Sequence, residues 1–254
     1  MILAWTGALI VGLSLGLLGS GGSILTVPIL IYLVGESEKE AIAESLGIVG
    51  AISLAGMIPF AFKKQIHWQS TIVFGLPGMA GTYFGAYLAA WVSGTFQLIL
   101  FAVVMIVAAL LMLNGKKTES VDTSPVKTKT QPWWVIASEG LIVGVITGLV
   151  GVGGGFLIVP ALVLFAGLPI HIAVGTSLTI IAMKSITGFL KYVELFASMD
   201  LFINWDLVLI FSLIGAAGSF LGKAIGNKIS GKNLKQVFAV FLLIMGGYII
   251  LMNI

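Results

Sequence analysis

Two glycine-rich clusters interrupt apolar stretches of the chain, and they are the first candidates for chemistry. They consist of Gly19, Ser20, Gly21 and Gly22 in the first half, and of Gly151, Gly153, Gly154 and Gly155 in the second. Glycine permits a chain reversal because it reaches positive φ without steric cost. Where helix resumes, near Ser23 and near Gly155, the first N–H groups lack intrahelical partners and the helix dipole adds partial positive charge. The clusters are therefore predicted to bind an anion through backbone N–H groups.

Close packing of small residues is the alternative explanation for each cluster, because glycine and proline are common in membrane helices. Two breaks at matching places in the two halves of a chain are, however, typical of a transporter site. Pro28 and Pro160 follow the clusters, in the second turn of each resumed helix. They are expected to bend these helices or to end their regular hydrogen bonding.

Three hydroxyl side chains are expected close to the breaks. Ser45, Thr176 and Ser177 are predicted to begin the helices that follow the glycine clusters. Their hydroxyl groups can donate to a bound anion, or they can bond back to the preceding helical turn. Because they align between the two halves, the ligand role is the preferred hypothesis.

Lys184 is the most informative charged residue. It lies about twelve residues into a predicted segment over 172–190, roughly 9 Å from the nearer end. An ionisable group at such a depth is a functional candidate by default, here as the cation that binds an anion. The alternative is that its long side chain reaches the outer membrane surface.

Glu44 occupies the position that corresponds to Thr176 in the other half. It is a candidate proton-coupling group, or else an acid placed favourably near a helix N-terminus at the membrane surface. Cysteine is absent and the two histidines are isolated. The sequence therefore predicts no metal site, no catalytic cluster and no cofactor.

The composition identifies a protein whose main solvent is lipid. Hydrophobic residues make up 59% of the 254 residues and charged residues only 9%, and no charge occurs from Met1 to Gly35. About 20 apolar residues suffice to span a bilayer. The sequence therefore predicts an all-α, polytopic membrane protein. Its scattered lysines are read as topology signals and not as a nucleic-acid site.

The chain contains two copies of one unit. Residues 11–30 match residues 143–162, so that Gly19 aligns with Gly151, and an offset of 137 later aligns Trp68 with Trp205. The first transmembrane repeat is assigned to 1–114, a polar linker to 115–132 and the second repeat to 133–254. Each half is expected to hold a broken segment and three further ones: 2–34, 41–62, 69–91 and 96–114, then 133–166, 172–190, 206–223 and 236–252.

Lysine placement predicts that the two repeats are inverted in the membrane. Basic residues flank opposite ends of corresponding segments in the two halves, and only inversion places most of them in the cytoplasm. Inversion requires an odd number of crossings in each half, so each broken segment should be a re-entrant hairpin. The protein is then expected in the cell inner membrane, with the linker in the cytoplasm and both termini outside.

The paired motifs resemble those of the TauE/SafE family of sulfite and organosulfonate transporters. The resemblance is carried by "GLLGSGGSILTVP" and "GLVGVGGGFLIVP", by "AVGTSL" at 173–178, and by Trp68 and Trp205. It implies a small integral membrane carrier for sulfur-containing anions such as sulfite, organosulfonates or thiosulfate. The first half departs from the pattern with "AIAESL", so symmetric use of the two halves is not implied.

Three classes of function fit these features to different degrees. The first hypothesis is a secondary transporter that rocks or gates inverted halves around an anion near the membrane midplane, coupled to H⁺ or Na⁺. The second is an anion channel that uses the glycine breaks as a filter. An intramembrane enzyme fits least, because the segments offer no nucleophile or base cluster.

Overall fold

The protein is built from long helices. The computed structural model describes residues 2–18, 22–114, 132–155, 158–159, 162, 167–199, 201–226 and 231–253. The elements are α1 (Ile2–Leu18), α2 (Ser23–Ile29), the π-helical turn η1 (Leu30–Val34), α3 (Glu38–Phe62), α4 (Trp68–Ala89), α5 (Gly94–Asn114), α6 (Trp133–Val150), α8 (Ile170–Met199), α9 (Trp205–Gly226) and α10 (Gly231–Asn253). Five of them, α3, α4, α6, α8 and α9, are long and apolar enough to cross a membrane. The predicted all-α polytopic fold is confirmed.

The first broken segment returns along its own first arm. A side-chain carbon added to Gly22 would collide with the backbone of Val11 and Leu15, and one added to Gly7 would meet Ile29. The chain that leaves α1 therefore runs back beside it through α2, as a re-entrant hairpin requires. Pro28 lies inside α2, and the α-helical pattern gives way to the π-helical turn at Leu30. The expected loss of regular hydrogen bonding near Pro28 is thus observed.

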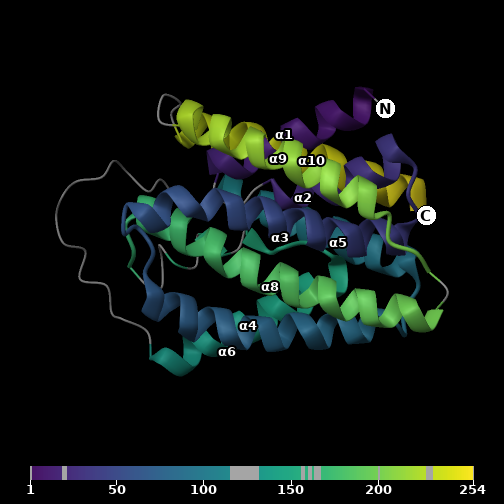
Figure 1. Cartoon of the computed structure of the whole chain (residues 1–254), viewed down its shortest axis with the longest axis horizontal. Coiled ribbons are helices and arrows are strands. Elements are labelled where there is room, and N and C mark those ends of the chain that lie inside the picture. The colour runs from purple at the N-terminus through teal and green to yellow at the C-terminus, as the bar shows by residue number, and fades with distance from the viewer. Residues whose placement is uncertain are drawn as a thin grey trace.

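The helices of the two halves are interlaced. Helix α1 of the first half packs along α9 of the second, and α6 of the second half packs along α4 of the first. Helix α3 packs on α8, and α5 packs on α10. Figure 1 shows α1 with α9 on one side of the bundle and α4 with α6 on the other, with α3 and α8 between them. These reciprocal pairings are those expected of two equivalent halves.

Glycines bring the paired backbones into direct contact. A Cβ atom on Gly16 of α1 would collide with the Ser219 carbonyl of α9, and a Cβ atom on Gly148 of α6 would collide with the Thr82 carbonyl of α4. Both contacts connect residues that correspond under the sequence repeat. Backbones that approach this closely gain dispersion and Cα–H···O contacts. The repeat seen in the sequence is therefore also a repeat of packing.

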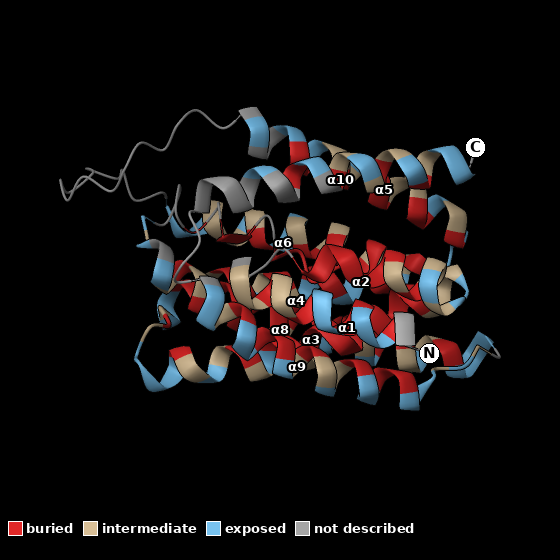
Figure 2. Ribbon diagram, turned by 90° about the horizontal axis from the view of Figure 1, so that it is seen from above, coloured by how far each residue is buried: buried red, intermediate tan, exposed pale blue. Residues whose placement is uncertain are grey.

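The centre of the bundle is formed by α3, α8 and the short helix α2 that follows α1. Figure 2 shows buried residues concentrated there, while the visible faces of α5, α9 and α10 carry many exposed residues. Both chain ends lie at the same end of the bundle in the two views (Figures 1 and 2). An exposed apolar outer surface is what a lipid environment requires.

Helix α8 is longer than the sequence suggests. It runs to Met199, whereas the predicted segment ended at 190. Lys191 and Glu194 form an ion pair of 2.8 Å between successive turns of this helix. Such pairs are compatible with a helical continuation. Helix α3 is also longer than the predicted segment 41–62, because it begins at Glu38.

Ser37 and Glu40 interact with each other at the start of α3. Ser37 is the N-cap residue, but its side chain makes no capping bond to the backbone. Its hydroxyl instead donates to the carboxylate of Glu40, with an oxygen–oxygen distance of 2.6 Å. The two side chains therefore satisfy each other at the exposed end of the helix.

Candidate functional site

The second glycine cluster forms a buried, non-helical break. Helix α6 ends at Val150, and the N–H groups of Gly151 and Val152 donate to the Thr147 carbonyl at 3.0 and 3.1 Å. Gly151 and Gly154 have φ values of 77° and 69°, in the left-handed region that favours glycine. Residues 151–155 are all buried, and helix resumes at Gly155. The predicted interruption of the second half is thus observed inside the protein.

Lys184 lies beside this break and not at the membrane surface. It is at the middle of the 30-residue helix α8, about 22 Å from either end, and its exposed fraction is 0%. Its Nζ atom is 3.3 Å from the place where a Cβ atom of Gly154 would be. The alternative of a side chain that reaches the surface is wrong, because α8 extends well beyond the predicted segment and buries Lys184 more deeply.

The ammonium group of Lys184 has no partner among the described residues. Its Nζ atom is buried and makes no hydrogen bond to a described residue. The ion pair found among the described residues joins Lys191 and Glu194. The aliphatic part of the side chain passes Gly78 of α4, where a Cβ atom would come within 2.9 Å of Cδ. A glycine is required at this place, because a larger residue would fill the space that the lysine occupies.

Ser185 adds a second polar group without a partner. Its exposed fraction is 0%, and its Oγ atom makes no hydrogen bond within the described residues. This Oγ atom is 2.8 Å from the place where a Cβ atom of Gly153 would be. The sequence reasoning did not select Ser185 as a ligand, although its alignment with Ser53 in the repeat is a signal that could have found it. Adjacent residues of α8 therefore present an ammonium group and a hydroxyl group to adjacent glycines.

The three predicted hydroxyl residues lie within helices and not at their starts. Ser45 is in the second turn of α3, and its hydroxyl contacts the carbonyls of Ile42 and Gly151. It therefore connects α3 to the second break. Thr176 and Ser177 lie in the second turn of α8, and the Ser177 hydroxyl donates to the Val174 carbonyl at 2.9 Å. The start of α8 at Ile170, earlier than predicted, moves these residues into the helix.

Thr176 and Glu44 make equivalent contacts in the two halves. The Thr176 hydroxyl accepts the N–H of His67 at 2.9 Å, and Glu44 Oε1 accepts the N–H of Asn204 at 2.8 Å. His67 and Asn204 are each the residue before the tryptophan that begins α4 or α9. Both contacts attach the start of a helix to its neighbour. Thr176 is also two turns of α8, about 12 Å, from Lys184.

Glu44 is buried rather than placed at the membrane surface. Its exposed fraction is 0%, and its Oε2 atom has no hydrogen-bond partner among the described residues. In the other half, Thr176 makes the equivalent contact with the single oxygen of its side chain. Glu44 therefore does not lie at the solvated interface considered as the alternative, and its proton-coupling role stays a prediction.

A polar network covers the last carbonyls of α6. The Gln97 amide donates to the Leu149 carbonyl at 2.6 Å and to the Tyr192 hydroxyl at 3.1 Å. The Tyr192 hydroxyl in turn donates to the Gly148 carbonyl at 3.2 Å. These bonds satisfy carbonyls that have no partner at the end of a helix. The sequence reasoning missed both side chains, which belong to α5 and α8.

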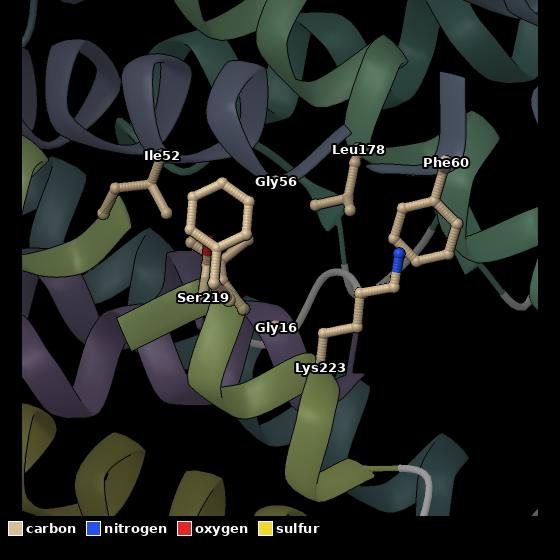
Figure 3. A pocket seen from close by; sticks show the side chains of 9 residues that line it. Gly16, Ile52, Gly56, Phe60, Leu178, Ser219 and Lys223 are labelled. Atoms are coloured by element: carbon tan, nitrogen blue, oxygen red, sulfur yellow. The ribbon is translucent and has the colours of Figure 1, made fainter. Parts of the chain in front are cut away.

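The first half has an apolar counterpart of the Lys184 site. Ile52 corresponds to Lys184 in the repeat, and it packs against Gly215 as Lys184 packs against Gly78. Ile52 lines a small cavity between α1, α3, α8 and α9 together with Gly16, Gly56 and Leu178. Figure 3 shows this cavity, with the Lys223 side chain extending toward the Phe60 ring. Lys223 Nζ is 3.5 Å from the centre of that ring.

Several predicted positions cannot be compared with the structure. Gly19, Ser20, Gly21, Pro160 and residues 115–131 of the linker lie outside the described residues. Gly22 is described, buried, and positioned as the N-cap of α2. The structure thus brings Ser45, Gly151, Gly153, Gly154 and Lys184 together around the second break.

Comparisons with known proteins agree with this architecture. The sequence model of the family described as sulfite exporter TauE/SafE matches residues 4–249. A probable membrane transporter protein of Xylella fastidiosa is 33% identical over 95% of this chain and 91% of its own length. Similar proteins with the same description occur in Methanocaldococcus jannaschii, at 29% identity over 96% and 94%, and in Bacillus subtilis, at 28% over 94% and 93%. No solved structure matches. With nearly its whole length matched to the family, the chain belongs to the TauE/SafE family of membrane transporters.

Proposed function

We propose that this protein is a secondary transporter of small sulfur-containing anions, such as sulfite, organosulfonates or thiosulfate. Its anion site is the second glycine break, where Lys184 supplies the positive charge. The family supports the sulfur-anion class. The observation that carries the proposal is a fully buried ammonium group, without a partner among the described residues, next to the buried backbone of Gly154.

A bound anion would offset the free-energy cost of burying the charged ammonium group of Lys184. An isolated charge inside a protein costs several kcal/mol unless it is paired and hydrogen-bonded. An oxyanion can accept from the ammonium group and from the Ser185 hydroxyl, which lies beside Gly153. The missing side chains of the two glycines allow the anion to approach the backbone. The site therefore favours a ligand with several acceptor oxygens and a negative charge.

A carrier fits this geometry better than an open pore. Lys184 is sealed from the surface, as in a state that encloses its substrate. The contacts between α1 and α9 and between α4 and α6 join helices from different halves. The moving bodies of the transport cycle are therefore these cross-half pairs, and not the two halves of the sequence. Gly19, Ser20, Gly21 and Gly22 would form the related break on the first-half side.

We infer the membrane placement from the distribution of lysines. The repeats are inverted in the inner membrane, the linker at 115–132 faces the cytoplasm, and both termini face outward. The two chain ends lie at the same end of the bundle, which supports placing both termini on one side of the membrane. Glu44 is the candidate group for coupling to protons, and Na⁺ is the other candidate coupling ion.

The test is uptake of radiolabelled sulfite into liposomes that contain the purified protein. We expect a saturable rate, and we expect Lys184→Gln to lower it by about 10- to 100-fold at low substrate, because a hydrogen bond to a charged group contributes about 1.5–3 kcal/mol. Lys191→Gln is the matched control, since Lys191 lies on the same helix but is paired with Glu194. Unchanged uptake by Lys184→Gln would refute the site, and a large non-saturating current would indicate a channel.

A further inference from the structure

We propose that, among the candidate substrates, the site accepts anions with a single negative charge, such as bisulfite or a sulfonate, and discriminates against dianions such as thiosulfate and sulfate. This inference rests on the proposed function and adds the charge state of the substrate. It follows from the number of charges around the second break. Among the described residues, one ammonium group is available there, and the other groups that face the break are neutral.

The charged groups buried in the described part of the chain are few. They are Lys184 and Glu44, both with an exposed fraction of 0%, and Lys191 at 6%. Lys191 is already neutralised by Glu194 at 2.8 Å and lies over the rings of Tyr83 and Tyr87. Of the two cations, Lys184 alone lacks a charged partner within the described residues.

The first half has no cation at the position that corresponds to Lys184. The residue that corresponds to Lys184 is Ile52, and its side chain packs on Gly215 and lines the apolar cavity of Figure 3. The lysine of that cavity, Lys223, directs its Nζ atom toward the Phe60 ring at the far end from Ile52. A symmetric pair of lysines would neutralise a dianion, whereas the observed site has one.

The other hydrogen-bond donors at the site are uncharged, so they favour a ligand with acceptor oxygens without adding positive charge. Ser185 Oγ and the backbone at Gly153 and Gly154 can donate hydrogen bonds to an oxyanion. Gly50 of α3 faces Ser185 and Ile186 across the helix contact, and Glu44 is about 9 Å farther along α3. The nearest buried acid on that helix therefore supplies no positive charge that could balance a second negative charge on the ligand.

Charge balance then decides between ligands of similar shape. A monoanion forms a neutral pair with Lys184, while a dianion leaves one uncompensated negative charge in a buried site. Methanesulfonate and sulfate are nearly equal in size and differ in charge. We expect sulfate to bind at least about tenfold more weakly than methanesulfonate, because an uncompensated charge is disfavoured in a membrane interior.

The experiment is competition for radiolabelled methanesulfonate bound to the full chain in lipid nanodiscs. Unlabelled methanesulfonate, sulfate and sulfite compete at several pH values around neutrality, where sulfite loses its second proton. Methanesulfonate keeps one charge throughout, so it controls for titration of the protein itself. The expected result is weak competition by sulfate, and competition by total sulfite that falls with rising pH relative to unlabelled methanesulfonate.

The outcomes separate this inference from the proposed function. Sulfate that competes as well as methanesulfonate, or sulfite that competes better as pH rises, would overturn the single-charge rule while leaving an anion site in place. Absence of binding by methanesulfonate and by sulfite would refute the anion site itself, and the rule with it. Selective competition by monoanions would support both.

Discussion

Replacing Gly148 by alanine tests whether backbone contact holds α4 and α6 together. In the structure, a Cβ atom on Gly148 would lie closer than 3.0 Å to the carbonyl oxygen and Cα atom of Thr82, a separation that real Cβ atoms do not show. Both obstacles belong to the backbone, so a side-chain rotation cannot relieve them. The two helices must therefore move apart.

The expected cost follows from that displacement. A gap of about 0.5–1 Å forfeits a quarter to a half of the dispersion energy of the atoms that line it. Insertion of an extra carbon into a well-packed contact costs about 1–3 kcal/mol. Alanine regains about 1 kcal/mol of helix preference over glycine. We expect a net destabilisation of up to about 2 kcal/mol and a melting temperature lower by up to about 5 °C, on the size scaling of soluble domains.

The measurement is thermal unfolding of the purified protein in detergent, followed by circular dichroism. Gly247→Ala is the matched control, because this glycine is also helical but has nothing within 4 Å of its added carbon. The control should melt at the wild-type temperature or above it. If Gly148→Ala and Gly247→Ala melt alike, the helices are not held by glycine-mediated contact, and the reasoning fails.

Two further substitutions probe polar groups of the interior. Tyr192→Phe removes the hydroxyl that donates to the Gly148 carbonyl and accepts from the Gln97 amide. We expect the free energy of unfolding, measured by thermal denaturation, to fall by about 1 kcal/mol. An unchanged melting curve would exclude a stabilising role for this network. Glu44→Gln keeps an oxygen that accepts the Asn204 N–H and removes a buried carboxylate, so folding should be retained while uptake loses its response to an imposed proton gradient. A response equal to that of the wild type would show that Glu44 does not couple protons.

Packing across the halves corrected the prediction in specific places. The segment predicted over 172–190 continues as helix to Met199, and Lys191 and Glu194 form an ion pair within this extension of α8. The extended helix then places Lys184 at its centre and removes the route to the surface. Ser45, Thr176 and Ser177 moved from helix starts into helices for the same reason, since helix ends depend on contacts that local patterns do not contain.

The sequence by itself determined the membrane class, the duplication, the two glycine breaks and the candidacy of Lys184. These properties depend on composition, spacing and self-similarity, which are local or repetitive features of a chain. The tertiary structure alone decided that α1 pairs with α9 and α6 with α4, that Ser185 stands beside Gly153, and that one half presents a lysine where the other presents Ile52 to an apolar cavity. These facts arise from contacts between residues far apart in the chain, and burial is a property of such contacts and not of any single residue.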